Sequence, residues 1–68
     1  MPTDTKKLKG KIIENGYTIK SFAEKLKLSA ATLSQKINNK IKFSQSDIKA
    51  ISELLNLTPT EIKDIFLN

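Results

Sequence analysis

The chain of 68 residues contains no cysteine, no histidine, no arginine and no tryptophan. Without cysteine there is no disulfide framework and no thiol-based metal site, and without histidine as well a zinc finger is excluded. No apolar run approaches the ~18 residues of a membrane span, and no apolar core of a signal peptide follows the N-terminus. We therefore expect a soluble, cytoplasmic protein that uses no metal or cofactor and binds no membrane.

Residues typical of enzyme active sites are also scarce. The only two glycines, Gly10 and Gly16, cannot form a phosphate-cradling loop, and no serine lies in a glycine-rich elbow. Four carboxylates in the C-terminal part could in principle pair for acid–base chemistry, but two of them fit helix starts and the other two fit a solvated face. They are Asp47, Glu53, Glu61 and Asp64. We therefore expect a protein that is not an enzyme.

The net charge of +5 is unevenly distributed along the chain. Residues 1–42 hold ten lysines against three acids, a net charge of +7, whereas residues 43–68 hold two lysines against four acids, a net charge of −2. All basic residues are lysines, which favour phosphate contact as a point charge over bidentate reading of bases. A lysine-rich composition can simply reflect an AT-rich genome, but that does not explain the difference between the two parts.

Four positions share one pattern, a hydroxyl residue between an apolar residue just before it and another four positions after it. This pattern is a hydrophobic staple around an N-cap and predicts a helix start. Two caps are followed three positions later by an acid, and one of these also has proline at the first helical position. The predicted N-caps are Thr18, Ser29, Ser44 and Thr58.

A further helix precedes these four. It is capped by one of residues 3–5 and ends at Asn15-Gly16, because both residues tolerate left-handed backbone angles. Gly10 either weakens this helix by ~1 kcal/mol relative to alanine or permits a close approach, and the sequence leaves both open. The residues expected to face inward are Leu8, Ile12 and Ile13.

The last two helices are expected over residues 44–55 and 58–67, after a loop at residues 38–42. No segment has the alternation of a strand, and there is no repeat. A chain of this length has room for one domain and buries only ~60% of its unfolded surface. The predicted fold is therefore all-α, one compact five-helix domain spanning residues 1–68.

Residues 18–37 predict two short helices joined by a tight corner. Leu26 ends the first apolar stripe and Ser29 caps the next helix, so only two residues lie between them. Ala23 is expected to face the corner, where its small side chain allows the two helices to cross closely. The second of these helices has an outward face with no acidic residue.

The same residues resemble the DNA-binding domain of the lambdoid Cro/CI repressor class, a helix-turn-helix of the xenobiotic-response-element type. The resemblance covers residues 8–66 and continues through Phe43-Ser44 into the last two helices. It implies a lambda-repressor-like domain with the helix-turn-helix in its second and third helices. The residues that carry it are Ala23, Leu28, the run Thr32-Leu33-Ser34-Gln35, and Asn38-Asn39-Lys40.

The resemblance implies that the third helix, about residues 29–38, enters the major groove of double-stranded DNA. Gln35 is the best candidate for direct readout, because an amide can bridge N6 and N7 of adenine. Alanines in this helix can offer methyl contacts to thymine, and DNA shape adds to specificity. The predicted base-contact residues are Ser29, Ala30, Ala31, Thr32 and Gln35.

Phosphate contacts are expected on both sides of that helix. One group lies at the start of the second helix, where free N–H groups favour an anion, and the other lies at the end of the third helix and beyond it. The predicted phosphate-contact residues are Thr18, Ile19, Lys20, Lys36, Asn38, Lys40 and Lys42.

Four residues depart from the pattern of the family. Lys27 and Asn39 stand where relatives often have glycine, and both positions can be occupied at modest strain. Ile19 replaces a glutamine that commonly holds a phosphate, although its backbone N–H remains. Ala30 replaces a residue that often reads a base, so the operator sequence cannot be inferred from the family.

The resulting hypothesis is a sequence-specific transcriptional regulator, a phage or prophage repressor that binds a palindromic operator as a homodimer. Phe66 and Leu67 form a candidate dimer surface, unless helix-five residues such as Ile62, Ile65 and Phe66 only close the core of the monomer. Two alternatives remain: the DNA-binding antitoxin of a toxin–antitoxin pair, and a protein-interaction module or anti-repressor on the same fold.

Overall fold

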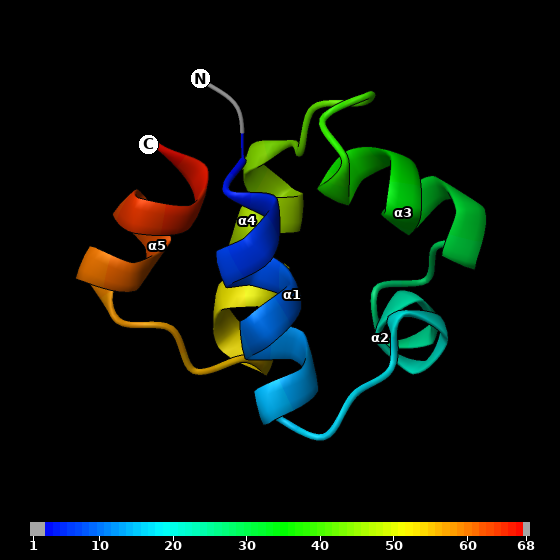
Figure 1. The fold of residues 1–68 in the computed structure, drawn as a ribbon, viewed down its shortest axis with the longest axis horizontal. Helices are drawn as coiled ribbons and strands as arrows, with labels where there is room; N and C mark the ends of the chain where they lie inside the picture. Colours follow the sequence, from blue (N-terminus) through cyan, green and yellow to red (C-terminus); the bar gives the residue numbers. More distant parts are fainter. Residues whose placement is uncertain (1–2, 68) are drawn as a thin grey trace.

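Each predicted N-cap hydroxyl begins a helix in the computed structural model, which describes residues 3–67. The five helices are α1 (Thr5–Glu14), α2 (Ile19–Lys25), α3 (Ala30–Ile37), α4 (Gln45–Leu54) and α5 (Pro59–Phe66) (Figure 1). The described residues contain no strand. The prediction of an all-α, five-helix fold is confirmed.

The N-terminal ends of the helices are held by side-chain caps. Asp4 caps α1 by accepting the N–H of Lys7, and the four predicted hydroxyl caps each accept the N–H three positions on. Asp47 and Glu61 close capping boxes at α4 and α5, as expected. A third capping box was not predicted: at α2, Ser21 returns the hydrogen bond of Thr18. Serine is shorter than the usual glutamate or glutamine at this position, so the motif was not apparent.

Four helices end in the same way. A residue with positive φ follows the helix, and its N–H and the N–H of the next residue each donate to a carbonyl of that helix. After α2, Lys27 has φ 60°, its N–H donates to Glu24 O at 3.1 Å, and the N–H of Leu28 donates to Ala23 O at 2.9 Å. This is a Schellman motif. The other left-handed residues are Gly16 (φ 85°), Asn39 (φ 64°) and Asn56 (φ 52°).

Three of the four connections are nearly identical in design. The left-handed residue is followed by an apolar residue that packs against the core, and then directly by the next N-cap; these apolar residues are Tyr17, Leu28 and Leu57. One apolar side chain thus anchors the end of one helix and the start of the next. The connection from α3 to α4 differs, because Lys40 follows Asn39 and the N-cap comes only at Ser44.

The core contains side chains from all five helices. Its buried members are Leu8, Ile12, Phe22, Ala23, Leu33, Ile37, Ile51, Leu55, Ile65 and Phe66. Ala23 is 1% exposed at the corner, as predicted. Ile13 was expected to face inward, but it is 66% exposed. The buried face of α1 repeats at i and i+4, through Leu8 and Ile12, and the next residue is turned by roughly 100° towards solvent.

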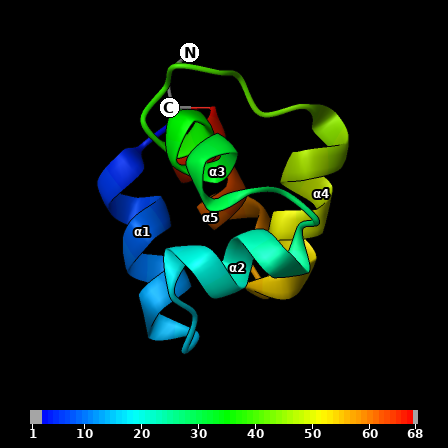
Figure 2. The same ribbon diagram turned by 90° about the vertical axis from the view of Figure 1, so that its right-hand side faces the viewer.

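Helices α2 and α3 pack against each other at a steep angle. Figure 1 views α2 nearly along its axis and α3 from the side, and Figure 2 reverses the two views. The N-cap and the first residue of α1 connect the far end of α3 to α5: the Thr5 hydroxyl donates to Ile37 O at 2.7 Å, and the Asp4 N–H donates to Ile65 O at 2.7 Å. This arrangement leaves the other side of α3 uncovered.

Within the described residues, none of the five helices is long and apolar enough to cross a membrane.

Candidate nucleic-acid interface

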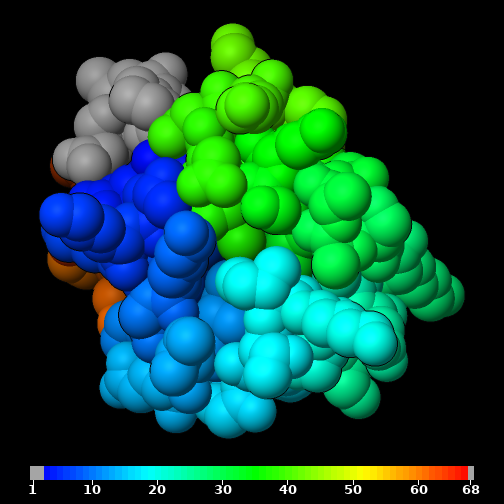
Figure 3. Space-filling view, turned by 45° about the vertical axis from the view of Figure 1, so that its right-hand side comes forward, coloured from blue at the N-terminus to red at the C-terminus, as the bar shows by residue number. Residues whose placement is uncertain are grey.

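The outer side of α3 forms a surface beside that of α2 on one face of the molecule (Figure 3, green and cyan). Ala30, Ala31 and Gln35 are exposed there, while Leu33 and Ile37 point into the core. The helix carries no acidic residue. Four of the five predicted base-contact residues are exposed and the fifth, Thr32, is half-buried, so all five are accessible on α3 and its N-cap.

Gln35 has an unengaged side-chain amide at the centre of this surface. Apart from the hydrogen bonds within α3 itself, only its backbone carbonyl is used, accepting the N–H of Lys40 at 2.8 Å and that of Ile41 at 3.3 Å. Within residues 3–67 the amide has no hydrogen-bond partner. An exposed amide with both donor and acceptor free can make the two-bond contact that adenine offers.

Ser29 and Thr32 act as a pair. The Ser29 Oγ accepts the N–H of Thr32 at 3.1 Å and donates its proton to Thr32 Oγ1 at 2.8 Å. The proton of the Ser29 hydroxyl is therefore used within the helix, and the free donor is the hydroxyl of Thr32. Sequence reasoning treated the two hydroxyls as equivalent, and the structure makes Thr32 the more available donor.

The start of α2 contributes the first group of predicted phosphate contacts. Thr18 is engaged in its capping box, with its oxygen accepting the N–H of Ser21 at 3.0 Å. Ile19 is half-buried and packs against the core, whereas Lys20 is exposed. The proton of the Thr18 hydroxyl has no acceptor among residues 3–67, so the side chains available to an anion here are those of Thr18 and Lys20.

The second group follows the end of α3. Asn38, Lys40 and Lys42 are all exposed, and the Asn38 amide makes only a long hydrogen bond of 3.4 Å to Ser34 Oγ. Neither of these two lysines is in an ion pair with any described residue. Their ammonium groups are free to contact phosphates.

Lys36 is arranged differently from the prediction. Its Nζ lies 2.5 Å from Asp47 Oδ2, and the two side chains are only 14% and 21% exposed. Burial alone would raise the pKa of Asp47, but the Lys36 ammonium and the N–H and hydroxyl of Ser44 outweigh it and hold that pKa below its ordinary value. Lys36 therefore joins α3 to α4 and is already paired, so it is less available than the other predicted phosphate contacts, and its phosphate contact stays a prediction. Sequence spacing of 11 residues gave no signal for this pair.

The candidate dimer surface is also corrected. Phe66 is only 5% exposed and meets Phe43 edge-on, with ring centroids 5.5 Å apart. It belongs to the core of the monomer, because the inward stripe of α5 continues through its last turn. Leu67 remains 61% exposed. It lines a groove together with Phe43, Phe66 and Ile41, and Ile41 is 42% exposed.

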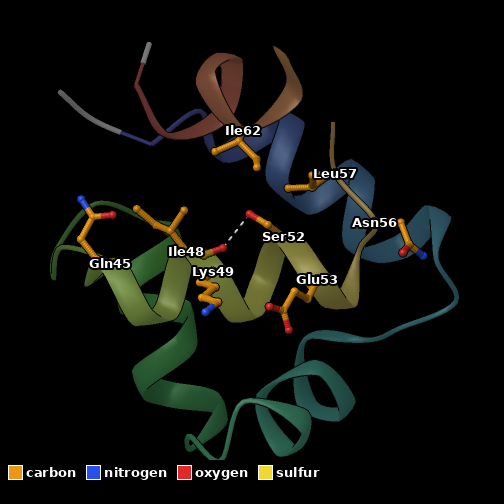
Figure 4. A pocket seen from close by; sticks show the side chains of 8 residues that line it. All are labelled: Gln45, Ile48, Lys49, Ser52, Glu53, Asn56, Leu57 and Ile62. Atoms are coloured by element: carbon orange, nitrogen blue, oxygen red, sulfur yellow. Dashed lines mark hydrogen bonds between the residues drawn. The ribbon is translucent and has the colours of Figure 1, made fainter. Parts of the chain in front are cut away.

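A second concavity, between α4 and α5, has no chemistry that suggests a site. Ile48, Ser52, Leu57 and Ile62 lie between the two helices, and the Ser52 hydroxyl donates to the carbonyl of Ile48 at 2.6 Å (Figure 4). Since that hydroxyl is engaged with its own helix, nothing activates it as a nucleophile. Across the described residues, no three metal-ligating side chains gather.

Two polar contacts between distant parts of the chain had no signal in the sequence. Asn39 forms two hydrogen bonds with the backbone of Thr3, and Lys11 forms an ion pair with Glu61 that joins α1 to α5. The partners are 36 and 50 positions apart. Local patterns give helix ends and faces, but not which exposed side chains meet once the helices pack.

Comparison with known proteins places the whole chain in a protein family. The chain matches, over residues 1–68, the family described as "Protein of unknown function (DUF739)". A search among curated proteins finds no match. The family description assigns no activity, so a function has to be argued from the surface of α2 and α3.

Proposed function

We propose that this chain, which belongs to the DUF739 family, is a sequence-specific double-stranded DNA-binding protein that regulates transcription, as a phage or prophage repressor of the Cro/CI type. One observation carries the proposal: an acid-free outer face of α3, with the unengaged amide of Gln35, lies between the exposed Lys20 of α2 and the exposed Lys40 and Lys42 after α3. A surface of this kind suits a groove of DNA between two phosphate backbones.

In the proposed complex, α3 lies in the major groove with its outer face against the base edges. The Gln35 amide bridges N6 and N7 of an adenine, a contact worth about 1–3 kcal/mol of discrimination. The Thr32 hydroxyl donates to a base or a phosphate, and the methyl groups of Ala30 and Ala31 contact thymine. With so few polar groups, specificity depends strongly on DNA shape.

Lysines on the two sides of α3 contact the backbone. Lys20 lies at the start of α2, and Lys40 and Lys42 lie in the loop after α3. The only acid on these two helices is Glu24, so little opposes the approach of a polyanion. Phosphate contacts of this kind fix the register of the helix without reading sequence.

The small size of the domain favours a dimer on a palindromic operator. One helix reads only a few base pairs, and half-sites usually lie about 34–36 Å apart. The described residues measure 26 × 24 × 21 Å, so two copies side by side can place their α3 helices about one turn of DNA apart. Sedimentation at high micromolar concentration tests this: a strict monomer both alone and on the selected duplex contradicts the dimer.

The function itself is tested by selection from a randomised duplex pool, followed by affinity measurements on the selected site. We expect a two-fold symmetric site, and we expect Gln35→Ala to weaken binding by about 1–3 kcal/mol at one symmetric pair of positions while relaxing the preference there. Gln45→Ala, on α4, is the matched control and should keep the base preference. Absence of any enriched sequence would contradict the proposal.

A further inference from the structure

The end of α3 is anchored differently from the ends of the other helices. After α1, α2 and α4, the residue that follows the left-handed position is apolar and packs against the core. After α3 that residue is Lys40, which is exposed and gives no apolar anchor. The backbone part of the Schellman motif is nevertheless present, because the N–H of Lys40 donates to Gln35 O at 2.8 Å.

A pair of hydrogen bonds takes the place of the missing apolar contact. The N–H of Thr3 donates to Asn39 Oδ1 at 2.7 Å, and Asn39 Nδ2 donates to the carbonyl of Thr3 at 3.1 Å. The two residues after Thr3 are themselves attached to two helices. The Asp4 N–H donates to Ile65 O of α5, and the Thr5 hydroxyl donates to Ile37 O of α3. The Thr3/Asn39 pair therefore ties the start of the loop at residues 39–43 to a rigid part of the fold.

The side-chain amide of Asn39 has a role beyond allowing a left-handed backbone at this position. A glycine would adopt φ 64° with less strain than asparagine. Asn56 has a similar φ of 52° at the same place in the connection after α4, yet its side chain has no hydrogen-bond partner among residues 3–67. The side chain of Asn39 thus makes a contact, with Thr3, that the side chain of Asn56 lacks.

We infer that Asn39 is a positioning residue for DNA binding: through its two hydrogen bonds to Thr3 it orders the loop that carries Lys40 and Lys42, and so presets these lysines for adjacent phosphates. This inference rests on the proposed function. Ordering the loop before binding reduces the conformational freedom that the lysines give up when they engage the backbone. Asn39 itself need not touch DNA.

The experiment compares Asn39→Gly with Asn56→Gly, each made in the full chain. Both variants keep a left-handed residue at a helix end, and both should keep wild-type helical circular dichroism and unfold cooperatively. On the selected duplex, we expect Asn39→Gly to bind about tenfold more weakly and with a shallower dependence of log K on log salt, by up to about 0.9 for each phosphate that is no longer neutralised. Asn56→Gly should bind within about twofold of wild type. Asn39→Gly binding as tightly as wild type, with an unchanged salt dependence, would overturn the inference.

Backbone ¹⁵N relaxation of the free protein separates this inference from the proposed function. We expect the amides of residues 40–42 to lose order in Asn39→Gly and to keep it in Asn56→Gly. Unchanged order in Asn39→Gly overturns the inference whether or not DNA binds. If wild type selects no duplex, the proposed function fails and the positioning role fails with it, even where relaxation shows that Asn39 orders the loop.

Discussion

At position 10, helix α1 carries a glycine that nothing in the fold requires. A Cβ built there meets no atom within 4 Å, so the alternative of a close approach is excluded. Gly16 is different, because its φ of +85° ends α1 in a conformation that residues with a side chain rarely adopt.

We predict opposite effects of alanine at these two positions. Gly10→Ala should stabilise the protein by about 1 kcal/mol and raise the Tm by roughly 4–8 °C, since it improves helix propensity at no steric cost. Gly16→Ala should destabilise it by about 1 kcal/mol through left-handed strain. Thermal unfolding followed by circular dichroism measures both, and a lower Tm for Gly10→Ala would contradict the account of α1.

Alanine substitution of the neighbouring residues Phe66 and Leu67, at the end of α5, should change the free energy of unfolding by very different amounts. Phe66→Ala removes a buried ring that contacts Phe43 and should cost about 3–5 kcal/mol, enough to unfold much of so small a domain. Leu67→Ala should change stability by no more than about 0.5 kcal/mol, because this side chain is mostly exposed. Urea unfolding at a low protein concentration, where the monomer is measured, tests the pair. Similar costs for both would show that Phe66 is not a core residue.

At the scale of helices, starts and ends were largely predictable because their signals are local. Apolar and hydroxyl residues at fixed spacing identified four N-caps, and Asn15-Gly16 marked the end of α1, where Gly16 has positive φ. The contacts between helices were not predictable in the same way. The ion pair between Lys36 and Asp47, for example, depends on how α3 and α4 pack, which no local pattern specifies.

Lowering the pH should weaken the ion pairs that join the helices, Lys11 with Glu61 and Lys36 with Asp47. The hydrogen bond from Lys11, together with the N–H of Thr58, lowers the pKa of Glu61, and the pKa of Asp47 is also lowered despite its partial burial. A carboxyl group with a lowered folded-state pKa contributes stability above its unfolded pKa, about 4, and this stability disappears as the pH falls through the folded pKa.

We therefore predict that the free energy of unfolding decreases from about pH 5 towards pH 3. Glu61→Gln keeps a residue that can close the capping box but removes the charge, so it should be less stable than wild type at pH 7 and approach wild type at low pH. Urea titrations at several pH values measure this difference. A difference that stays constant from pH 7 to pH 3 would contradict the role of the Glu61 charge.

For the whole molecule, the uneven charge distribution predicts which lysines govern the salt dependence of DNA affinity. Lys40→Ala with Lys42→Ala should reduce the slope of log K against log salt by about 0.9 for each phosphate that the variant no longer neutralises. Lys49→Ala with Lys63→Ala removes the same charge from α4 and α5 and should leave the slope nearly unchanged. Equal effects of the two double variants would mean that net charge, rather than the loop after α3, governs binding.

The candidate site was predictable to a different degree from the fold. The exposed face of α3 followed from helical periodicity around Leu33 and Ile37, and so did the outward position of Gln35. Periodicity does not reveal pairing, which is why Lys36 and the Ser29 hydroxyl were assigned roles that their partners restrict. It also cannot find an anchor such as Asn39, whose partner, Thr3, lies 36 positions away in the sequence.

The central claim is that the α3 surface recognises a particular DNA sequence. The most direct measurement is the ratio of affinities for the selected duplex and for a scrambled duplex of the same length and composition, at one near-physiological salt concentration. We predict a ratio of about 10³ or more. A ratio near one would contradict it, because it would leave only the non-specific attraction of a lysine-rich surface for phosphate.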